Sequence, residues 1–196
     1  MKSYSLRIVL LKNASLNEVS QFFSRMQMGI QLIPAEKRNA IQSGIRHAID
    51  SNARNNEFFK NSRIPVARYK HQDYLAHVFT LLRDPKLRDI KAPRLNDVYE
   101  AIIVLEKSDV KLLKDIYECL LFLDKVNSWC SNKIVQKWIF VDFLCWLYQR
   151  RSTLRQMKSK DIAQKYLRFS DLRRKHTAEP QELLSGRSSI ENKHLY

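Results

Sequence analysis

The chain has 196 residues, of which 44% are hydrophobic, and this content argues against disorder of the whole chain. Its 35 Lys and Arg residues outnumber 20 Asp and Glu residues, and the net charge of +15 favours an anionic partner, nucleic acid first. Only three Gly and five Pro are present, too few for the many turns of an all-β fold, so we expect a mainly α-helical protein.

The cysteines and the most apolar stretch bear on the compartment of the protein. Cys119, Cys130 and Cys145 are odd in number and lie in apolar stretches, so we expect reduced core residues rather than disulfides. The most apolar stretch, residues 138–148, is too short to span a bilayer, which needs about 20 apolar residues. Arg7 interrupts the apolar run at the N-terminus, which therefore does not resemble a signal peptide. These features predict a soluble, cytoplasmic protein without a membrane partner.

The first predicted element is a β-strand from Tyr4 to Leu11, where apolar residues alternate and then run on through aliphatic residues. A single strand is not stable alone in water. It must pair with a partner chain, with a part of a larger domain, or with a further short strand of this chain.

Two predicted helices follow and meet at a corner. Ser15 and Glu18 form a capping box that begins the first helix, and Gly29 suits its C-terminal cap. Pro34 opens the second helix, whose apolar face continues to Ile49.

The rest of the chain is predicted to be helical with two interruptions. Residues 52–69 form a loop with a short helix around Phe58 and Phe59, and residues 84–94 form a charged hinge. We expect one domain over residues 1–176, a helical bundle with one N-terminal β-strand, and a flexible polar tail over residues 177–196. The remaining predicted helices are 70–83, 95–107, 108–128, 131–151 and 158–175.

Nearly half of the excess charge lies in the last quarter of the chain. Residues 150–196 hold twelve Lys and Arg against five Asp and Glu, a net charge of +7. Such a cluster can neutralise phosphates, although a solvated helix face with a basic tail is the alternative. No zinc finger, basic zipper or helix-turn-helix spacing is present. The candidate phosphate contacts are Arg150, Arg151, Arg168, Arg173, Arg174 and Lys175.

No catalytic or metal-binding pattern is found. The five histidines are scattered without nearby cysteine pairs, and three glycines cannot build a phosphate-binding loop. We expect His71 and His77 to serve polar surface or capping roles. The sequence therefore predicts no catalytic residue, metal or cofactor.

The corner between the first two helices is the most distinctive segment. It brings Arg25 and Gln27, at the end of the first helix, near Glu36 and Arg38 at the start of the second. One interpretation is structural, in which Glu36 complements the helix dipole and binds Arg25 or Arg38. The other is that Arg25, Gln27 and Arg38 contact nucleic acid, while Gly29, Glu36 and Asn39 shape the corner.

This segment resembles the second, mainly helical half of the N-terminal module of GmrSD-type modification-dependent restriction enzymes, a ParB/sulfiredoxin-like family. The resemblance covers residues 4–50, with Gln27 where the family more often has Asn. It implies a setting in phage defence, and it implies that the family's Asp-Gly-Gln-Gln-Arg half and its nuclease module are not in this chain. The strand would then join a sheet built largely by that other half. The matching residues are Phe23, Arg25, Met26, Gly29, Leu32, Glu36, Arg38, Asn39 and Ala40.

Together these observations predict a non-catalytic helical module that binds nucleic acid, DNA first, or a partner protein that pairs with Tyr4 to Leu11. One alternative is a subunit of a split NTP-dependent DNA restriction enzyme whose catalytic half is another chain. Another is an interaction or inhibitor subunit whose basic charge only maintains solubility.

Overall fold

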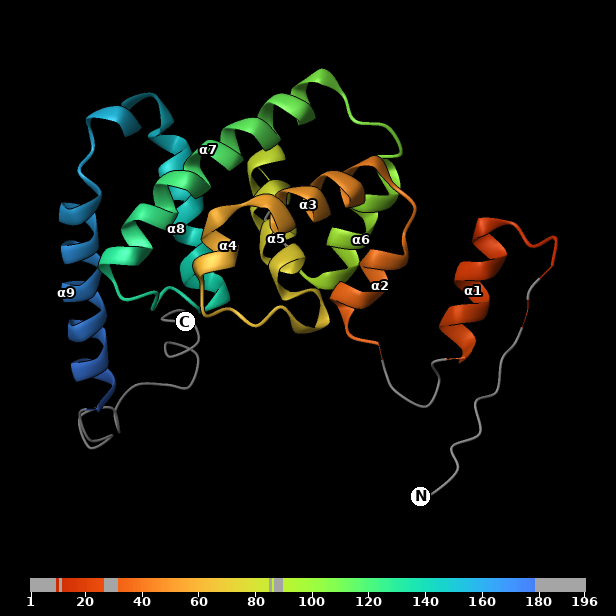
Figure 1. Cartoon of the computed structure of the whole chain (residues 1–196), viewed down its shortest axis with the longest axis horizontal. Coiled ribbons are helices and arrows are strands. Elements are labelled where there is room, and N and C mark those ends of the chain that lie inside the picture. Colours follow the sequence, from red (N-terminus) through yellow and green to blue (C-terminus); the bar gives the residue numbers. More distant parts are fainter. Residues whose placement is uncertain (1–9, 11, 27–31, 85, 87–89, 179–196) are drawn as a thin grey trace.

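The computed structural model describes residues 10, 12–26, 32–84, 86 and 90–178 (Figure 1). These residues are mainly helical, which confirms the mainly α part of the predicted fold class, and no strand is present among them. The strand predicted from Tyr4 to Leu11 lies outside the described residues, Leu10 excepted. The helices are α1 (Leu16–Met26), α2 (Pro34–Ala40), α3 (Gly44–Asn55), α4 (Glu57–Asn61), η2 (Ala67–Tyr69), α5 (Lys70–Arg83), α6 (Ala92–Ala101), α7 (Lys107–Trp129), α8 (Lys137–Gln149), η3 (Arg151–Gln156) and α9 (Ser159–Ala178).

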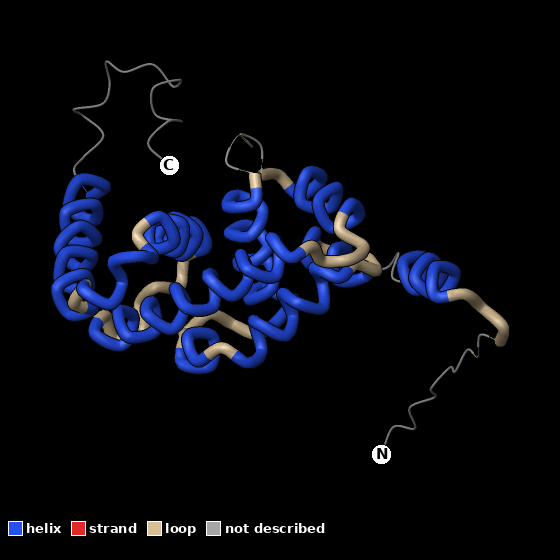
Figure 2. Tube along the Cα trace, turned by 90° about the horizontal axis from the view of Figure 1, so that it is seen from above, coloured by secondary structure: helices blue, strands red, loops and turns tan. Residues whose placement is uncertain are grey.

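Helix α1 stands apart from the other helices in both views (Figures 1 and 2). Its predicted capping box is confirmed: the Ser15 amide donates to Glu18 Oε2 at 2.8 Å, and the Glu18 amide donates to Ser15 Oγ at 3.3 Å. Ser20 Oγ reaches the Ala40 carbonyl of α2 at 3.4 Å. The predicted cap at Gly29 lies outside the described residues.

The prediction of a single helix from Pro34 to Ile49 is wrong, because α2 ends at Ala40 and α3 begins at Gly44. Ser43 caps α3, with its Oγ accepting from the Arg46 amide at 3.3 Å. The Gly44 amide donates to the Ile102 and Ile103 carbonyls at 3.1 and 2.9 Å. A Cβ atom at Gly44 would lie 2.9 Å from the Ile103 oxygen, so only glycine permits this approach.

Helix α5 lies at the centre of the bundle, packed against α2, α3, α6, α7 and α8 (Figure 1). Its bounds match the predicted helix 70–83. Phe79 is fully buried and belongs, with Phe58 of α4 and Phe140 of α8, to one contiguous core. The short helix predicted around Phe58 is confirmed as α4, although α3 continues to Asn55 where a loop was predicted.

Helices α6 to α9 correspond to the four later predicted helices but differ in their ends, and η3 between α8 and α9 was not predicted. Helix α7 agrees closely with the prediction, and α6 occupies residues 92–101 rather than 95–107. The predicted helix 131–151 begins six residues late, at Lys137, because the side chain of Asn127 holds a turn: its Oδ1 accepts from the Ile134 amide at 3.0 Å. The predicted hinge 84–94 includes the start of α6, and half of its remainder, residues 85 and 87–89, lies outside the described residues.

Helices α7, α8 and α9 form one end of the bundle, with the helical turn η3 between α8 and α9 (Figures 1 and 2). Helix α9 extends to Ala178, so it includes the first residues of the predicted tail, and residues 179–196 lie outside the described part of the chain. Within the described residues, no helix is both long and apolar enough to cross a membrane.

Candidate functional site

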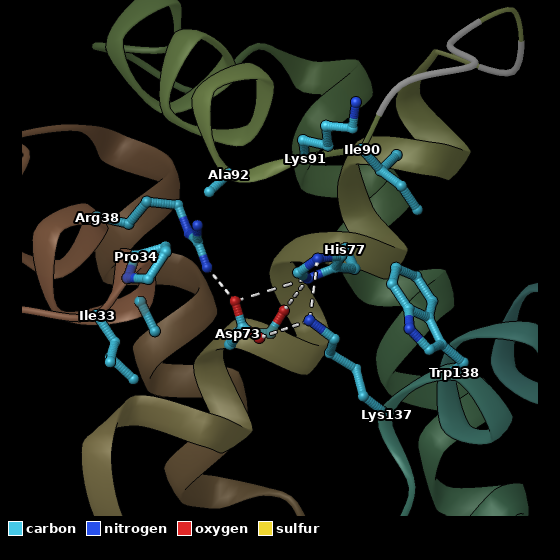
Figure 3. Close-up of a pocket in the computed structure, with 11 residues that line it drawn as sticks. Ile33, Pro34, Arg38, Asp73, His77, Ile90, Lys91, Ala92, Lys137 and Trp138 are labelled. Carbon is cyan, nitrogen blue, oxygen red and sulfur yellow. Dashed lines mark hydrogen bonds and ion pairs between the residues drawn. The ribbon is translucent and has the colours of Figure 1, made fainter.

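A cavity of about 480 Å³ lies where α2 and α5 meet the N-terminal ends of α6 and α8 (Figure 3). Its wall combines five ionisable side chains with aliphatic and aromatic ones. This mixture is typical of small-molecule sites, whose volumes are about 300 to 1,000 Å³. The lining residues are Ile33, Pro34, Ala35, Arg38, Asp73, His77, Ile90, Lys91, Ala92, Lys137 and Trp138.

Asp73 is the centre of a charged cluster in this wall. The Arg38 guanidinium points from α2 toward it and bonds Oδ1 through Nη2 (Figure 3). Lys137 Nζ approaches Oδ2 of the same carboxylate at 3.3 Å. The Arg38 side chain is 3% exposed, so its charge depends on this pairing for compensation.

Arg38 has one donor that this pairing does not satisfy. Its Nη1 atom is buried and has no hydrogen-bond partner. More than nine in ten buried polar groups in proteins have a partner, so this donor of Arg38, a residue of the cavity wall, is an exception.

His77 lies one helical turn beyond Asp73 and is 5% exposed. Its Nδ1 is 2.7 Å from the Asp73 carbonyl, which can only accept, so Nδ1 carries the proton. Burial lowers the pKa of His77, the positive charges of Lys137 and Arg38 lower it further, and Asp73 opposes them. The imidazole is therefore neutral at pH 7, and its Nε2 lone pair faces Lys137 Nζ at 3.5 Å.

Trp138 closes the cavity beside this cluster (Figure 3). The His77 ring meets the indole edge-on, with ring centroids 5.4 Å apart. Lys137 Nζ lies 5.0 Å from the centroid of the same indole. The Trp138 side chain is 49% exposed, so part of the ring remains accessible from the cavity mouth.

Apart from the Trp138 indole, the polar groups of the lining are charged or imidazole side chains. No hydroxyl or thiol is among the lining residues, and no group of three potential metal ligands occurs in the described part of the chain. The cysteines are free, as predicted, with Cys119 and Cys130 buried and Cys145 partly buried. Burial raises the pKa of the Cys119 thiol to about 12 and those of Cys130 and Cys145 to about 11, which makes them poor nucleophiles.

The structure describes only part of the predicted corner. Gln27 and Gly29, with the side chain of Arg25, lie outside the described residues. Glu36 does cap α2, because its Oε2 accepts from the Ile33 amide at 2.9 Å, but its ion-pair partner is Arg68 at 3.0 Å and not Arg38.

The structure gives Arg38 and Asn39 structural contacts. Arg38 faces the cavity and α5 instead of an open surface suited to a phosphate backbone. The Asn39 carbonyl accepts from Arg46 Nη1 at 2.9 Å.

A second feature is the basic segment, defined here as residues 150–160 at the end of α8, in η3 and at the start of α9. Its five Lys and Arg side chains are exposed, and it contains no acidic residue. Arg150 lies 4.6 Å from the Trp146 ring and Arg151 4.2 Å from the Tyr148 ring. Arg151 also pairs with Asp115 at 3.3 Å. The five residues are Arg150, Arg151, Arg155, Lys158 and Lys160.

The predicted cluster on α9 is described only in part. Arg168 is exposed on this helix. Arg173, Arg174 and Lys175 belong to the same helix, but their side chains lie outside the description.

The cavity was not predicted from the sequence. His71 and His77 were expected at the surface or in caps, yet they are 6% and 5% exposed. His71 stacks on Phe59 with ring centroids 4.6 Å apart and bonds the Ile64 carbonyl. In the sequence, the four-residue spacing of Asp73 and His77 on one predicted helix was the one local pattern that could have indicated the charged cluster.

Comparison with known proteins does not extend this description. No protein-family model, no curated protein and no solved structure matches the chain significantly. The resemblance of residues 4–50 to GmrSD-type modules therefore stays a prediction.

Proposed function

We propose that the chain is a nucleic-acid-binding helical module whose contact surface is centred on the basic segment. The observation that carries the proposal is the segment's five exposed cations without an intervening acid. Phosphate neutralisation by such side chains supplies most of the affinity of binding that does not depend on base sequence.

The charge imbalance extends into the neighbouring helices. Residues 125–160 contain eight Lys and Arg and one acid, Asp142. Within the basic segment, only Arg151 has an acidic partner among the ion pairs found, and this partner is the half-buried Asp115. Most of the local positive field is therefore available to an external polyanion.

Exposed aromatic surface lies beside these cations. Trp129, at the end of α7, is 54% exposed, and Lys160 Nζ lies 5.1 Å from its ring centroid. A cation beside an accessible indole can hold a phosphate while the ring stacks on a base. The combination suits unpaired or distorted nucleic acid as well as a duplex.

DNA is the first nucleic acid to test. The support is the resemblance of residues 4–50 to modules of DNA restriction enzymes, which also suggests a role in phage defence. In this proposal the chain binds nucleic acid without a catalytic step of its own.

The test is fluorescence anisotropy with a labelled duplex and a labelled single strand over about 50 to 200 mM salt. A variant with Arg155→Gln, Lys158→Gln and Lys160→Gln removes three charges from the basic segment. We expect weaker binding, and for the duplex a salt dependence whose slope is smaller by about 0.9 for each lost phosphate contact.

The matched control removes three exposed charges at the end of the bundle away from α9, through Lys37→Gln on α2, Arg94→Gln on α6 and Lys107→Gln at the start of α7 (Figure 1). We expect the control variant to keep most of the affinity and the salt slope. Equal losses in both variants, or no binding by the parent chain at the lowest salt, would refute the proposal.

A further inference from the structure

The cavity beside Asp73 carries an inference that does not depend on nucleic-acid binding. We propose that this cavity is a binding site for a small organic carboxylate with an apolar body. The anionic end would lie against Arg38 and Lys137, and the body against Trp138 and the aliphatic wall (Figure 3).

The polar end of the cavity has an uncompensated positive charge. Arg38 and Lys137 both contact Asp73, so two cations share one carboxylate, and the neutral His77 adds no charge. The buried Nη1 of Arg38 has no acceptor. A single additional anion would balance the charge and supply an acceptor for this donor.

The apolar part of the cavity wall favours an apolar body for the ligand. The apolar wall is formed by Ile33, Pro34 and Ala35 at the start of α2, by Ile90 just before α6 and by Ala92, the first residue of α6. None of these side chains offers a hydrogen bond, so polar groups on the body of the ligand would be desolvated without compensation. Burial of hydrocarbon is favourable by about 25 cal/mol for each Å².

A carboxylate fits the polar end better than a phosphate group does. Asp73 remains within 3.3 Å of Lys137, so any ligand oxygen bound by Lys137 lies close to this fixed negative charge. Arg38, Lys137 and Asp73 together carry one net positive charge, which a carboxylate monoanion balances and a phosphate dianion over-compensates. The planar guanidinium of Arg38 also matches the geometry of a carboxylate.

The experiment is titration of the full chain with phenylacetate and hexanoate, followed by ¹H–¹⁵N correlation spectra. Phenylacetamide, which keeps the shape without the charge, and inorganic phosphate are titrated in parallel. We expect saturable shifts of the amides around Lys137 and Trp138 with both carboxylates. Phenylacetamide and phosphate should bind at least about tenfold more weakly.

Two substitutions assign the site without disturbing the buried pair. Lys137→Met removes a charge from a side chain that is 31% exposed, and we expect it to weaken phenylacetate binding about tenfold. Trp138→Leu should weaken phenylacetate more than hexanoate, because it removes an aromatic surface. The control is Lys133→Met, an exposed lysine outside the cavity, which should leave both affinities unchanged.

The outcomes separate clearly. Absence of shifts with both carboxylates at tens of millimolar overturns the proposal, as does binding of phosphate or phenylacetamide as tight as that of phenylacetate. Equal weakening by Lys133→Met and Lys137→Met places binding elsewhere and also overturns it. The basic-segment variant keeps the cavity, so failure of nucleic-acid binding leaves this titration unaffected.

Discussion

The ion pair between Arg38 and Asp73 permits a direct test of how the cavity wall is stabilised. The Arg38 side chain is 3% exposed and that of Asp73 is 18% exposed. Removing one partner of a buried pair costs about 3 to 5 kcal/mol, because the other charge is left without compensation. Asp73→Asn leaves Arg38 in this situation, and we expect a loss of about 3 kcal/mol in the free energy of unfolding.

Arg38→Met is expected to cost less, about 2 kcal/mol, because Asp73 keeps the contact with Lys137 and stays partly exposed. The double variant should then lose about 3 kcal/mol rather than the sum of the two. The coupling of about 2 kcal/mol is measured as a double-mutant cycle by urea denaturation, followed by far-UV circular dichroism.

The control cycle uses the exposed pair Lys60 and Glu57, whose side chains are 52% and 53% exposed at an N–O distance of 2.8 Å. Solvent screens such a pair, so its coupling should be much smaller than that of Arg38 and Asp73 despite the short distance. If the costs of Arg38→Met and Asp73→Asn add within about 0.5 kcal/mol, the two side chains do not stabilise the wall as a pair. The reasoning about burial would then be refuted.

Three further predictions concern other buried groups. Because the pKa of His77 is lowered in the folded protein, the unfolded chain takes up a proton near pH 6.5 while the folded chain does not. The free energy of unfolding should therefore fall between about pH 7 and pH 5. In urea titrations, His77→Gln should reduce this fall. Gly44→Ala should destabilise the protein by about 1 to 3 kcal/mol, because the new Cβ meets the Ile103 carbonyl; a raised thermal midpoint would contradict this. Asn127→Ala should cost about 1 to 3 kcal/mol in urea denaturation and speed hydrogen exchange at the Ile134 amide; slow exchange there would show that the turn persists without the side chain.

The elements that the sequence predicted well are those defined by local signals. Helix α5 has an apolar stripe from Leu75 to Leu82 and ends before Pro85, and its predicted bounds agree with the structure. The break between α2 and α3 had no comparable signal. It depends on hydrogen bonds from Gly44 to carbonyls nearly sixty residues later, so the apolar periodicity across residues 40–49 suggested continuity where tertiary contacts impose a turn.

The candidate site was less predictable for the same reason. Arg38 was singled out for its place in a corner motif, but its partner Asp73 lies 35 residues away and contacts Lys137 a further 64 residues on. Each of these residues is ordinary on its own helix. Only the packing of α2, α5 and α8 turns them into one charged cluster, and no spacing within a single helix encodes that.

The net charge of +15 therefore has two different physical meanings in this chain. At the basic segment the cations are exposed and separated, which suits a polyanion and makes binding sensitive to salt. In the cavity, Arg38 contributes to the same total while it is buried against Asp73. A buried charge is screened little by salt, so binding in the cavity should persist at ionic strengths that abolish binding at the basic segment. Salt dependence thus separates the two proposals, although both begin from the same excess of Lys and Arg.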